Sequence, residues 1–249
     1  MLFSSFTFLY FFLPGVLFFY YVVFRNNRPL QNYFLLLSSL LFYAWGEPKF
    51  VLVMLASIIV NWLFGFLINK YRYLDKFCKG MLVLDVAINL GILFVFKYLT
   101  FTGKIINRFL AETIPFPDIA LPVGISFFTF QSMSYVIDVY RQKGEAQTNL
   151  LNVGLYISFF PQLIAGPIVR YETVANEINH RKETLDDFLD GFARFVMGLS
   201  KKVLLSNSLG ILADQVFTAV ENGHAISVLF GWLGAIAYAM QIFFDFSGY

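Results

Sequence analysis

The sequence predicts an all-α polytopic membrane protein, and three observations support this prediction. Hydrophobic residues make up 58% of the 249 residues and charged residues only 14%, which is too much apolar surface for a soluble domain of this length. The apolar residues form runs long enough to cross a bilayer. The net charge of +2 is grouped near the ends of these runs, as in membrane proteins and unlike a nucleic-acid-binding surface. We therefore expect a multi-pass protein with no nucleic-acid partner.

The first three apolar runs predict helices. Phe3–Phe24 is long enough to span, contains a kink signal at Pro14-Gly15, and lacks the basic start and small-residue cleavage site of a secretory signal. Residues 30–45 are short for a span, and the turn at 46–49 closes a helical hairpin with a span over 50–68. We expect all three to remain in the mature protein.

Basic residues predict the orientation. The loop after residue 68 has four basic residues against one acid, and basic residues also follow the first helix; together these are Arg25, Arg28, Lys70, Arg72, Lys76 and Lys79. Both loops are expected in the cytoplasm, so Met1 lies outside. A fourth helix over 81–98 then leads outward to an external loop over 100–118 that holds a short surface helix.

The fourth helix carries Asp85 and Asn89 one turn apart, and two interpretations stay open for this pair. The two side chains form hydrogen bonds between helices, or they line an aqueous space. Cys78, in the basic loop, is the one cysteine of the sequence and is interpreted as a bystander thiol.

The next helix, over 122–140, carries a polar stripe. Its residues recur at spacings of three, four and three, which places them on one helix face: Gln131, Ser134, Asp138 and Arg141. An Asp or Arg at the centre of a bilayer costs roughly 2.5 to 3.5 kcal/mol on insertion scales. The stripe is therefore expected to face protein or water and not lipid.

A broken apolar segment follows the stripe. The run over 153–169 contains Pro161, Gly166 and Pro167, which interrupt the backbone hydrogen bonds of a straight helix, and Arg170 follows it. Broken backbone at membrane depth occurs only beside protein or a cavity. We expect a bent or re-entrant segment beside the striped helix, after a polar cytoplasmic turn over 141–149.

The last third of the chain is expected to be partly interfacial. Residues 171–190 predict an amphipathic helix on the membrane surface, and 192–206 and 209–220 predict short, tilted or interfacial helices. Residues 226–249 form a last apolar helix that contains Asp245 and Ser247. The chain stops inside this helix, so we expect a truncated piece of a longer protein, with residues 1–249 in a single transmembrane domain.

The polar residues within apolar runs define a candidate corridor: Gln131, Ser134, Asp138, Arg141, Gln162, Arg170, Asp245 and Ser247. In one interpretation these groups pair with each other or with carbonyls freed near Pro161 and Gly166. In the other they border a passage for a polar molecule. The sequence shows no metal-ligand spacing and no nucleophile or phosphate-loop motif, and His180 and His224 lie in polar stretches. No catalytic or metal-binding residue is assigned.

Four motifs carry a family resemblance: LPVGISF at 121–127, SYVIDVYR at 134–141, FPQLIAGPIVR at 160–170 and FDFSGY at 244–249. They resemble the membrane-bound O-acyltransferase family in its bacterial alginate O-acetyltransferase branch. Residues 3–5, 42–45 and 97–98 match as well, so the resemblance extends over the whole chain.

The resemblance implies a multi-pass enzyme of the bacterial inner membrane, with a helical bundle around a funnel or tunnel. An acyl group, such as acetyl from acetyl-CoA or another acyl thioester, would enter from the cytoplasm. It would pass to hydroxyls of an exported polysaccharide such as alginate, with a periplasmic or membrane-anchored acyltransferase partner. Membrane lipid surrounds the bundle, and no bound cofactor is implied. The family's histidine motifs lie beyond FDFSGY, and neither His180 nor His224 matches them, so the chain alone is expected to be inactive.

Two other classes of function stay open on the residues. A transporter or channel subunit would use the same corridor without acyl chemistry, and a scaffold would use it only for packing.

Overall fold

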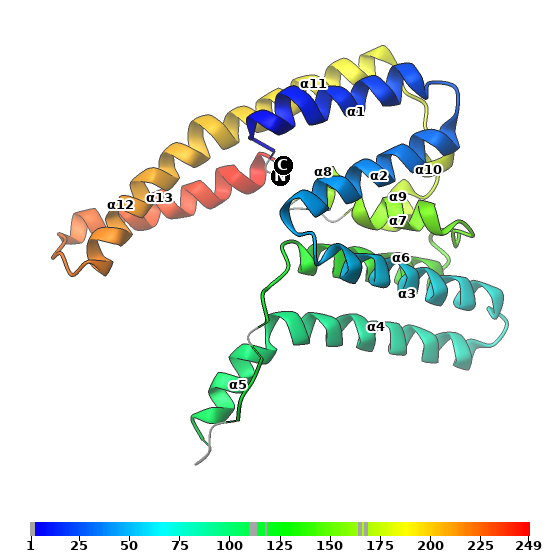
Figure 1. Ribbon diagram of the computed structural model, residues 1–249, viewed down its shortest axis with the longest axis horizontal. Coiled ribbons are helices and arrows are strands. Elements are labelled where there is room, and N and C mark those ends of the chain that lie inside the picture. The colour runs from blue at the N-terminus through cyan, green and yellow to red at the C-terminus, as the bar shows by residue number, and fades with distance from the viewer. Residues whose placement is uncertain (1–2, 110–113, 118, 164–165, 167–168) are drawn as a thin grey trace. The chain divides into compact units, whose positions relative to one another are not determined.

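The computed structural model describes residues 3–109, 114–117, 119–163, 166 and 169–249, and the regular elements in these ranges are helices (Figure 1). Four of the helices described are long and apolar enough to cross a membrane: Val51–Lys70, Asp75–Lys97, Leu185–Glu221 and Val228–Ser247. The prediction of an all-α polytopic membrane protein is confirmed. Residues 12–181 form one compact unit, and residues 3–11 with 182–249 form a second one.

The first helical stretch runs from Phe8 to Val23. It comprises a π-helical turn η1 (Phe8–Phe12), α1 (Leu13–Phe18) and a second π-helical turn η2 (Phe19–Val23). Pro14 has no backbone N–H to donate to the preceding turn, and the widened geometry of η1 directly precedes it.

The first unit has a bundle of predicted helices. These are α2 (Arg28–Gly46), α3 (Val51–Lys70), α4 (Asp75–Lys97) and α6 (Ile125–Tyr140). Asn27 caps α2 by accepting the backbone N–H of Leu30 over 3.1 Å. Figure 1 shows α3, α4 and α6 side by side, and all three pack against one another.

The start of α4 corrects the expected boundary. The helix begins at Asp75 and not near residue 81, so Lys76, Cys78 and Lys79 are helical. Asp75 lies in the first turn, where a carboxylate stabilises the exposed N–H groups of the helix end. Cys78 is buried, and its thiol donates to the carbonyl oxygen of Tyr71 over 3.3 Å.

A buried polar seam joins α3, α4 and α6. The Asn61 and Asn89 side-chain amides exchange hydrogen bonds of 3.3 and 3.0 Å, and the Ser57 and Ser132 hydroxyls lie 3.3 Å apart. Asn89 therefore has the role of an interhelical hydrogen bonder, one of its two expected roles. Asp85, which is fully buried, accepts the Asn89 side-chain N–H at its backbone oxygen over 2.9 Å.

The segment after α4 contains the predicted short helix, α5 (Leu99–Asn107). The Asn107 amide donates to the backbone oxygen of Ile114 over 2.9 Å and accepts its N–H over 3.0 Å. These two hydrogen bonds hold Ile114 against the end of α5.

The apolar run after residue 149 is broken as expected. It forms α7 (Leu150–Ser158) and the single turn α8 (Phe160–Leu163), with Phe159 between them outside helical geometry. The break precedes Pro161, because a proline is tolerated in the first turn of a helix, where its missing N–H has no partner to lose.

The amphipathic helix expected over 171–190 is not formed as one element. Two single turns, α9 (Tyr171–Val174) and α10 (Glu177–His180), end at Arg181, whose backbone is extended. Arg181 is held there by hydrogen bonds to the Tyr20 hydroxyl over 2.7 Å and the Asn32 side chain over 2.7 Å. A tertiary contact thus overrides the local amphipathic pattern.

The second unit also corrects the sequence prediction. In place of short interfacial helices, α11 (Leu185–Ser200), the π-helical turn η3 (Lys201–Ser206) and α12 (Asn207–Glu221) form one helix of 37 residues. A capping box between Thr184 and Asp187 starts it, and residues 185–221 contain no proline to end it early. The last helix, α13 (Val228–Ser247), matches its predicted range and packs against α12.

Candidate functional site

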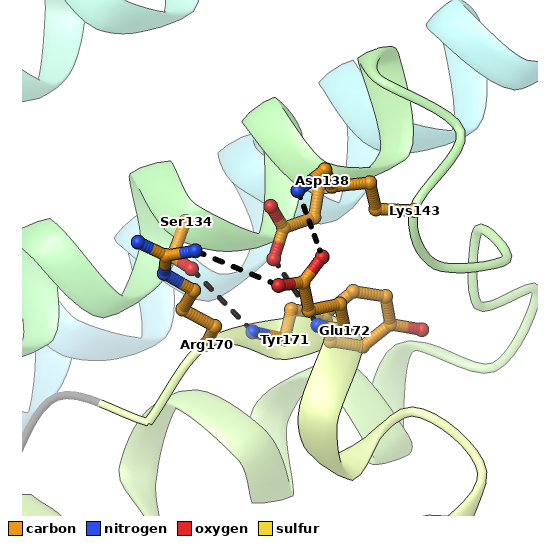
Figure 2. Close-up of polar contacts among 6 residues, drawn as sticks. All are labelled: Ser134, Asp138, Lys143, Arg170, Tyr171 and Glu172. Atoms are coloured by element: carbon orange, nitrogen blue, oxygen red, sulfur yellow. Dashed lines mark hydrogen bonds and ion pairs between the residues drawn. The ribbon is translucent and has the colours of Figure 1, made fainter.

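The polar stripe of α6 binds the backbone at the start of α9 (Figure 2). The Ser134 hydroxyl accepts the N–H of Tyr171 over 3.4 Å, and the Asp138 carboxylate accepts the N–H of Glu172 over 3.1 Å. These N–H groups belong to the first turn of a helix, where no carbonyl of the same helix can accept them. Side chains of α6 therefore cap α9 across the fold.

Gln131 lies about one helical turn before Ser134 in the stripe and binds α8. Its side chain is buried, and its Nε2 donates to Oε1 of Gln162 over 2.9 Å and approaches the backbone oxygen of Tyr156 at 3.5 Å. A buried amide without partners would cost about 1 to 3 kcal/mol. The pair gives the buried Gln131 amide nitrogen an acceptor on Gln162 and connects α8 to α6.

Charged residues surround the α9 end of the stripe. Glu172 forms ion pairs with Lys143 over 3.3 Å and with Arg170 over 3.6 Å. The Arg170 side chain is 71% exposed, so its pair contributes little to stability. Arg141, the last residue of the predicted stripe, is exposed at the C-terminal end of α6.

Three buried tyrosines pack behind these contacts. The Tyr171 ring meets those of Tyr135 and Tyr156 edge to face, with centroids 4.9 and 5.3 Å apart. The Tyr171 hydroxyl donates to the backbone oxygen of Glu145 over 2.6 Å. Burial raises the pKa of Tyr171 to about 12, so this hydroxyl stays protonated at neutral pH.

Two glycines allow the backbone to pass closely through this region. Gly124, at the start of α6, has a φ of +77°, and a Cβ there would lie 2.9 Å from the backbone oxygen of Leu163. A Cβ at Gly166 would lie 2.7 Å from Cα of Gln162 and 2.8 Å from the oxygen of Pro161. Of the predicted backbone break, Pro161 lies exposed in α8 and Gly166 is buried, while Pro167 falls outside the described residues.

Asp245 and Ser247 belong to the second unit, where two lysines bind them. Lys202 forms an ion pair of 2.5 Å with Asp245, and the Lys201 ammonium donates to the backbone oxygen of Ser247 over 3.2 Å. Both lysines come from η3 and both acceptors from the last turn of α13.

Six of the eight predicted corridor residues lie in the first unit, and five have named partners there: Gln131 with Gln162, Ser134 and Asp138 with the α9 backbone, and Arg170 with Glu172. These contacts are of the kind expected if the polar groups pair with each other. A passage beside them stays a prediction.

Sequence reasoning did not identify Glu172, Tyr171 or Lys202. Glu172 lies at the start of a polar stretch, directly after Tyr171, and Lys202 lies between the third and fourth motifs, so local pattern gives no signal for either. Among the residues that the structure describes, no group of three or more His, Cys, Asp and Glu could hold a metal ion.

Comparison with curated proteins finds relatives over the whole chain. The Pseudomonas aeruginosa protein named "Probable alginate O-acetylase AlgI" is 39% identical over 253 residues, covering 100% of this chain and 47% of the relative. The protein of that name from Azotobacter vinelandii is 39% identical over 255 residues, covering 100% and 49%. The Helicobacter pylori "Peptidoglycan O-acetyltransferase" is 27% identical over 278 residues, covering 100% and 52%.

The chain spans about half the length of the curated relatives it matches. No family model and no solved structure matches it.

Proposed function

Because this chain belongs to the membrane-bound O-acyltransferase family, in the alginate O-acetylase branch, we propose that its protein is a membrane O-acyltransferase. It transfers an acyl group, most simply acetyl, to hydroxyls of an exported polysaccharide such as alginate. The observation that carries this proposal is the 39% identity to a relative named as an alginate O-acetylase across 100% of the chain. The relative named as a peptidoglycan O-acetyltransferase supports a polysaccharide acceptor in a second case.

This chain supplies part of the helical wall of the acyl passage. The proposed lining residues are those of the candidate corridor, Gln131, Ser134, Asp138, Arg141, Gln162, Arg170, Asp245 and Ser247. The support comes from α6, whose polar stripe binds α8 through Gln131 and the start of α9 through Ser134 and Asp138. These side chains position the wall and form hydrogen bonds. None of them is assigned proton transfer.

The broken segment is the proposed border of the passage. A backbone interrupted at Phe159 leaves carbonyl groups without partners in their own helix, and such groups are tolerated in a membrane only beside protein or a polar space. Gln131 satisfies one of them by approaching the Tyr156 oxygen at 3.5 Å. The remaining polar edge faces the space that a thioester-derived acyl group would cross.

The acyl donor is acetyl-CoA or another acyl thioester, reached from the cytoplasmic end of α6. The protein lies in the bacterial inner membrane with its N-terminus outside, an orientation supported by the basic residues after the first and third helices. A periplasmic or membrane-anchored acyltransferase takes part on the outer side. Neither His180 nor His224 matches the family's histidine motifs, so the reacting centre is assigned to no residue of this chain.

Reconstitution of the full-length protein in lipid vesicles tests the proposal. Radiolabelled acetyl-CoA is supplied on the side of the basic loops and a deacetylated mannuronate polymer on the other side, with and without the candidate partner. We expect label on the polymer. Movement of an intact polar solute with no ester formed would support a transporter instead and overturn the proposal.

A further inference from the structure

The second unit contains a lysine pair that neither the motifs nor the comparisons assign a role. Lys201 and Lys202 lie in the π-helical turn η3, in the middle of a helix of 37 residues. Consecutive side chains on an α-helix diverge by about 100°. The wider π-helical turn narrows this divergence, so two adjacent lysines can reach the same end of a neighbouring helix. Such π-helical turns occur often at functional sites.

Both lysines bind the last turn of α13, and they bind different kinds of group. Lys202 meets the Asp245 carboxylate at 2.5 Å, while Lys201 donates to the Ser247 backbone oxygen over 3.2 Å. The backbone oxygens of a last helical turn have no N–H partner within the helix. The lysine pair therefore neutralises a carboxylate and caps a helix end together.

Three further contacts fix the register of the two helices. A Cβ on Gly198 would collide with the backbone oxygen of Gly248, so the two backbones meet without a side chain between them. The Ser206 hydroxyl donates to the backbone oxygen of Gln241 over 3.1 Å. At Gly210, a Cβ would lie 2.9 Å from the Gln241 amide nitrogen. Contacts above and below the lysines leave α13 little freedom to slide.

The Lys202–Asp245 pair is half-buried, with each side chain 31% exposed. A fully exposed pair contributes little, because water and salt screen it, and long side chains lose entropy on ordering. A pair shielded by packed helices holds its geometry better. The lysine pair is therefore placed to fix where Asp245 and Ser247 point.

We propose that Lys201 and Lys202 are positioning residues, which hold the Asp245–Ser247 turn of α13 in the register that acyl transfer requires. This inference rests on the proposed function, since it concerns two residues assigned to the passage. It adds two residues of η3 to those proposed to act in acyl transfer.

The experiment uses the full-length protein and measures kcat and KM for the polysaccharide per folded molecule, with folded protein counted by size-exclusion chromatography. Lys202→Met is expected to lower kcat by about tenfold or more, because small displacements of positioned groups cost large factors in rate. KM is expected to change less than kcat. Lys202→Arg, which keeps the charge, is expected to retain most of the activity. Lys104→Met in α5 is the matched control, since it removes an exposed lysine.

A charge swap, Lys202→Asp with Asp245→Lys, keeps the test decisive if Lys202→Met does not fold. The swapped pair is expected to regain both thermal stability and kcat. An active wild type with unchanged kcat in Lys202→Met, or a swap that regains stability without kcat, would overturn the inference. A full-length wild type that transfers no acyl group would instead overturn the proposed function, and the two failures are thus distinguishable.

Discussion

The Asp138 carboxylate on α6 accepts the backbone N–H of Glu172 on α9 over 3.1 Å, across 34 positions of sequence. The carboxylate is buried, and a charged acceptor makes a stronger hydrogen bond than a neutral one. This contact fixes α9, which follows the broken apolar run, to the polar stripe of α6. We call the Asp138–Glu172 hydrogen bond the clamp. It connects Asp138 of the SYVIDVYR motif to a residue two positions after the end of the FPQLIAGPIVR motif.

The first prediction concerns the buried hydroxyl of Tyr171. Tyr171→Phe keeps the ring but removes the donor to Glu145, so the unfolding free energy should fall by about 1 kcal/mol. Thermal unfolding of the purified protein in detergent measures the change. Tyr33→Phe, at a side chain that is 45% exposed on α2, is the control. Equal effects of the two substitutions would contradict the assigned hydrogen bond.

A second prediction tests the polar seam between α3 and α4. Asn61→Leu and Asn89→Leu each remove one partner of the reciprocal amide pair. A double-mutant cycle should give a coupling of about 0.6 kcal/mol, the average for hydrogen bonds between membrane helices, and at most about 1.7 kcal/mol. Unfolding by a denaturing detergent provides the four stabilities. Strictly additive effects would show that the two amides do not interact.

Close packing at Gly65 gives a third prediction. A Cβ there would lie 2.5 Å from the Tyr135 ring, so Gly65→Ala should destabilise by about 1 to 3 kcal/mol through overpacking. Gly91→Ala in α4 is the matched control, because nothing lies within 4 Å of its added Cβ. It should be neutral or stabilise by up to about 1 kcal/mol, since alanine is the better helix former. The reverse order of stabilities would refute the packing of α3 on α6.

A fourth prediction concerns orientation. Phe109→Cys, at a side chain that is 85% exposed after α5, should react with an impermeant thiol reagent added outside intact cells. Thr148→Cys, exposed before α7, should react only after the membrane is opened. Cys78 is buried and should stay unlabelled in both cases. Labelling in the opposite sense would invert the proposed topology.

The sequence was sufficient to predict the fold class and most spans. The thickness of the bilayer sets the length that a spanning helix needs, and apolar runs of that length can be read directly from the sequence. The sequence also predicted the break in the run after Asn149, since Pro161 has a fixed φ and no N–H to donate, and Gly166 is a poor helix former because its backbone is free. Helix α4 began earlier than expected because the polar residues from Asp75 onward extend a helix outside the apolar run.

Other features depended on contacts between distant residues. The break at Arg181 follows from its bonds to Tyr20 and Asn32, more than a hundred positions away in sequence. The stripe of α6 was visible as a 3.6-residue period. Its partners could not be predicted, because Ser134 and Asp138 accept backbone N–H groups, and every residue except proline has such a group. The ion pair of Lys202 with Asp245 likewise required the packing of two helices.

The most direct test of the account compares Asp138→Ala with Asp138→Asn in the full-length protein reconstituted in vesicles. Acetyl transfer to the polysaccharide is measured per folded molecule. The alanine removes the acceptor for the Glu172 N–H, so transfer should fall by about tenfold or more, while asparagine keeps an acceptor oxygen and should retain most of it. Wild-type transfer by a folded Asp138→Ala protein would contradict the claim that this clamp serves acyl transfer, and would leave it a scaffold contact.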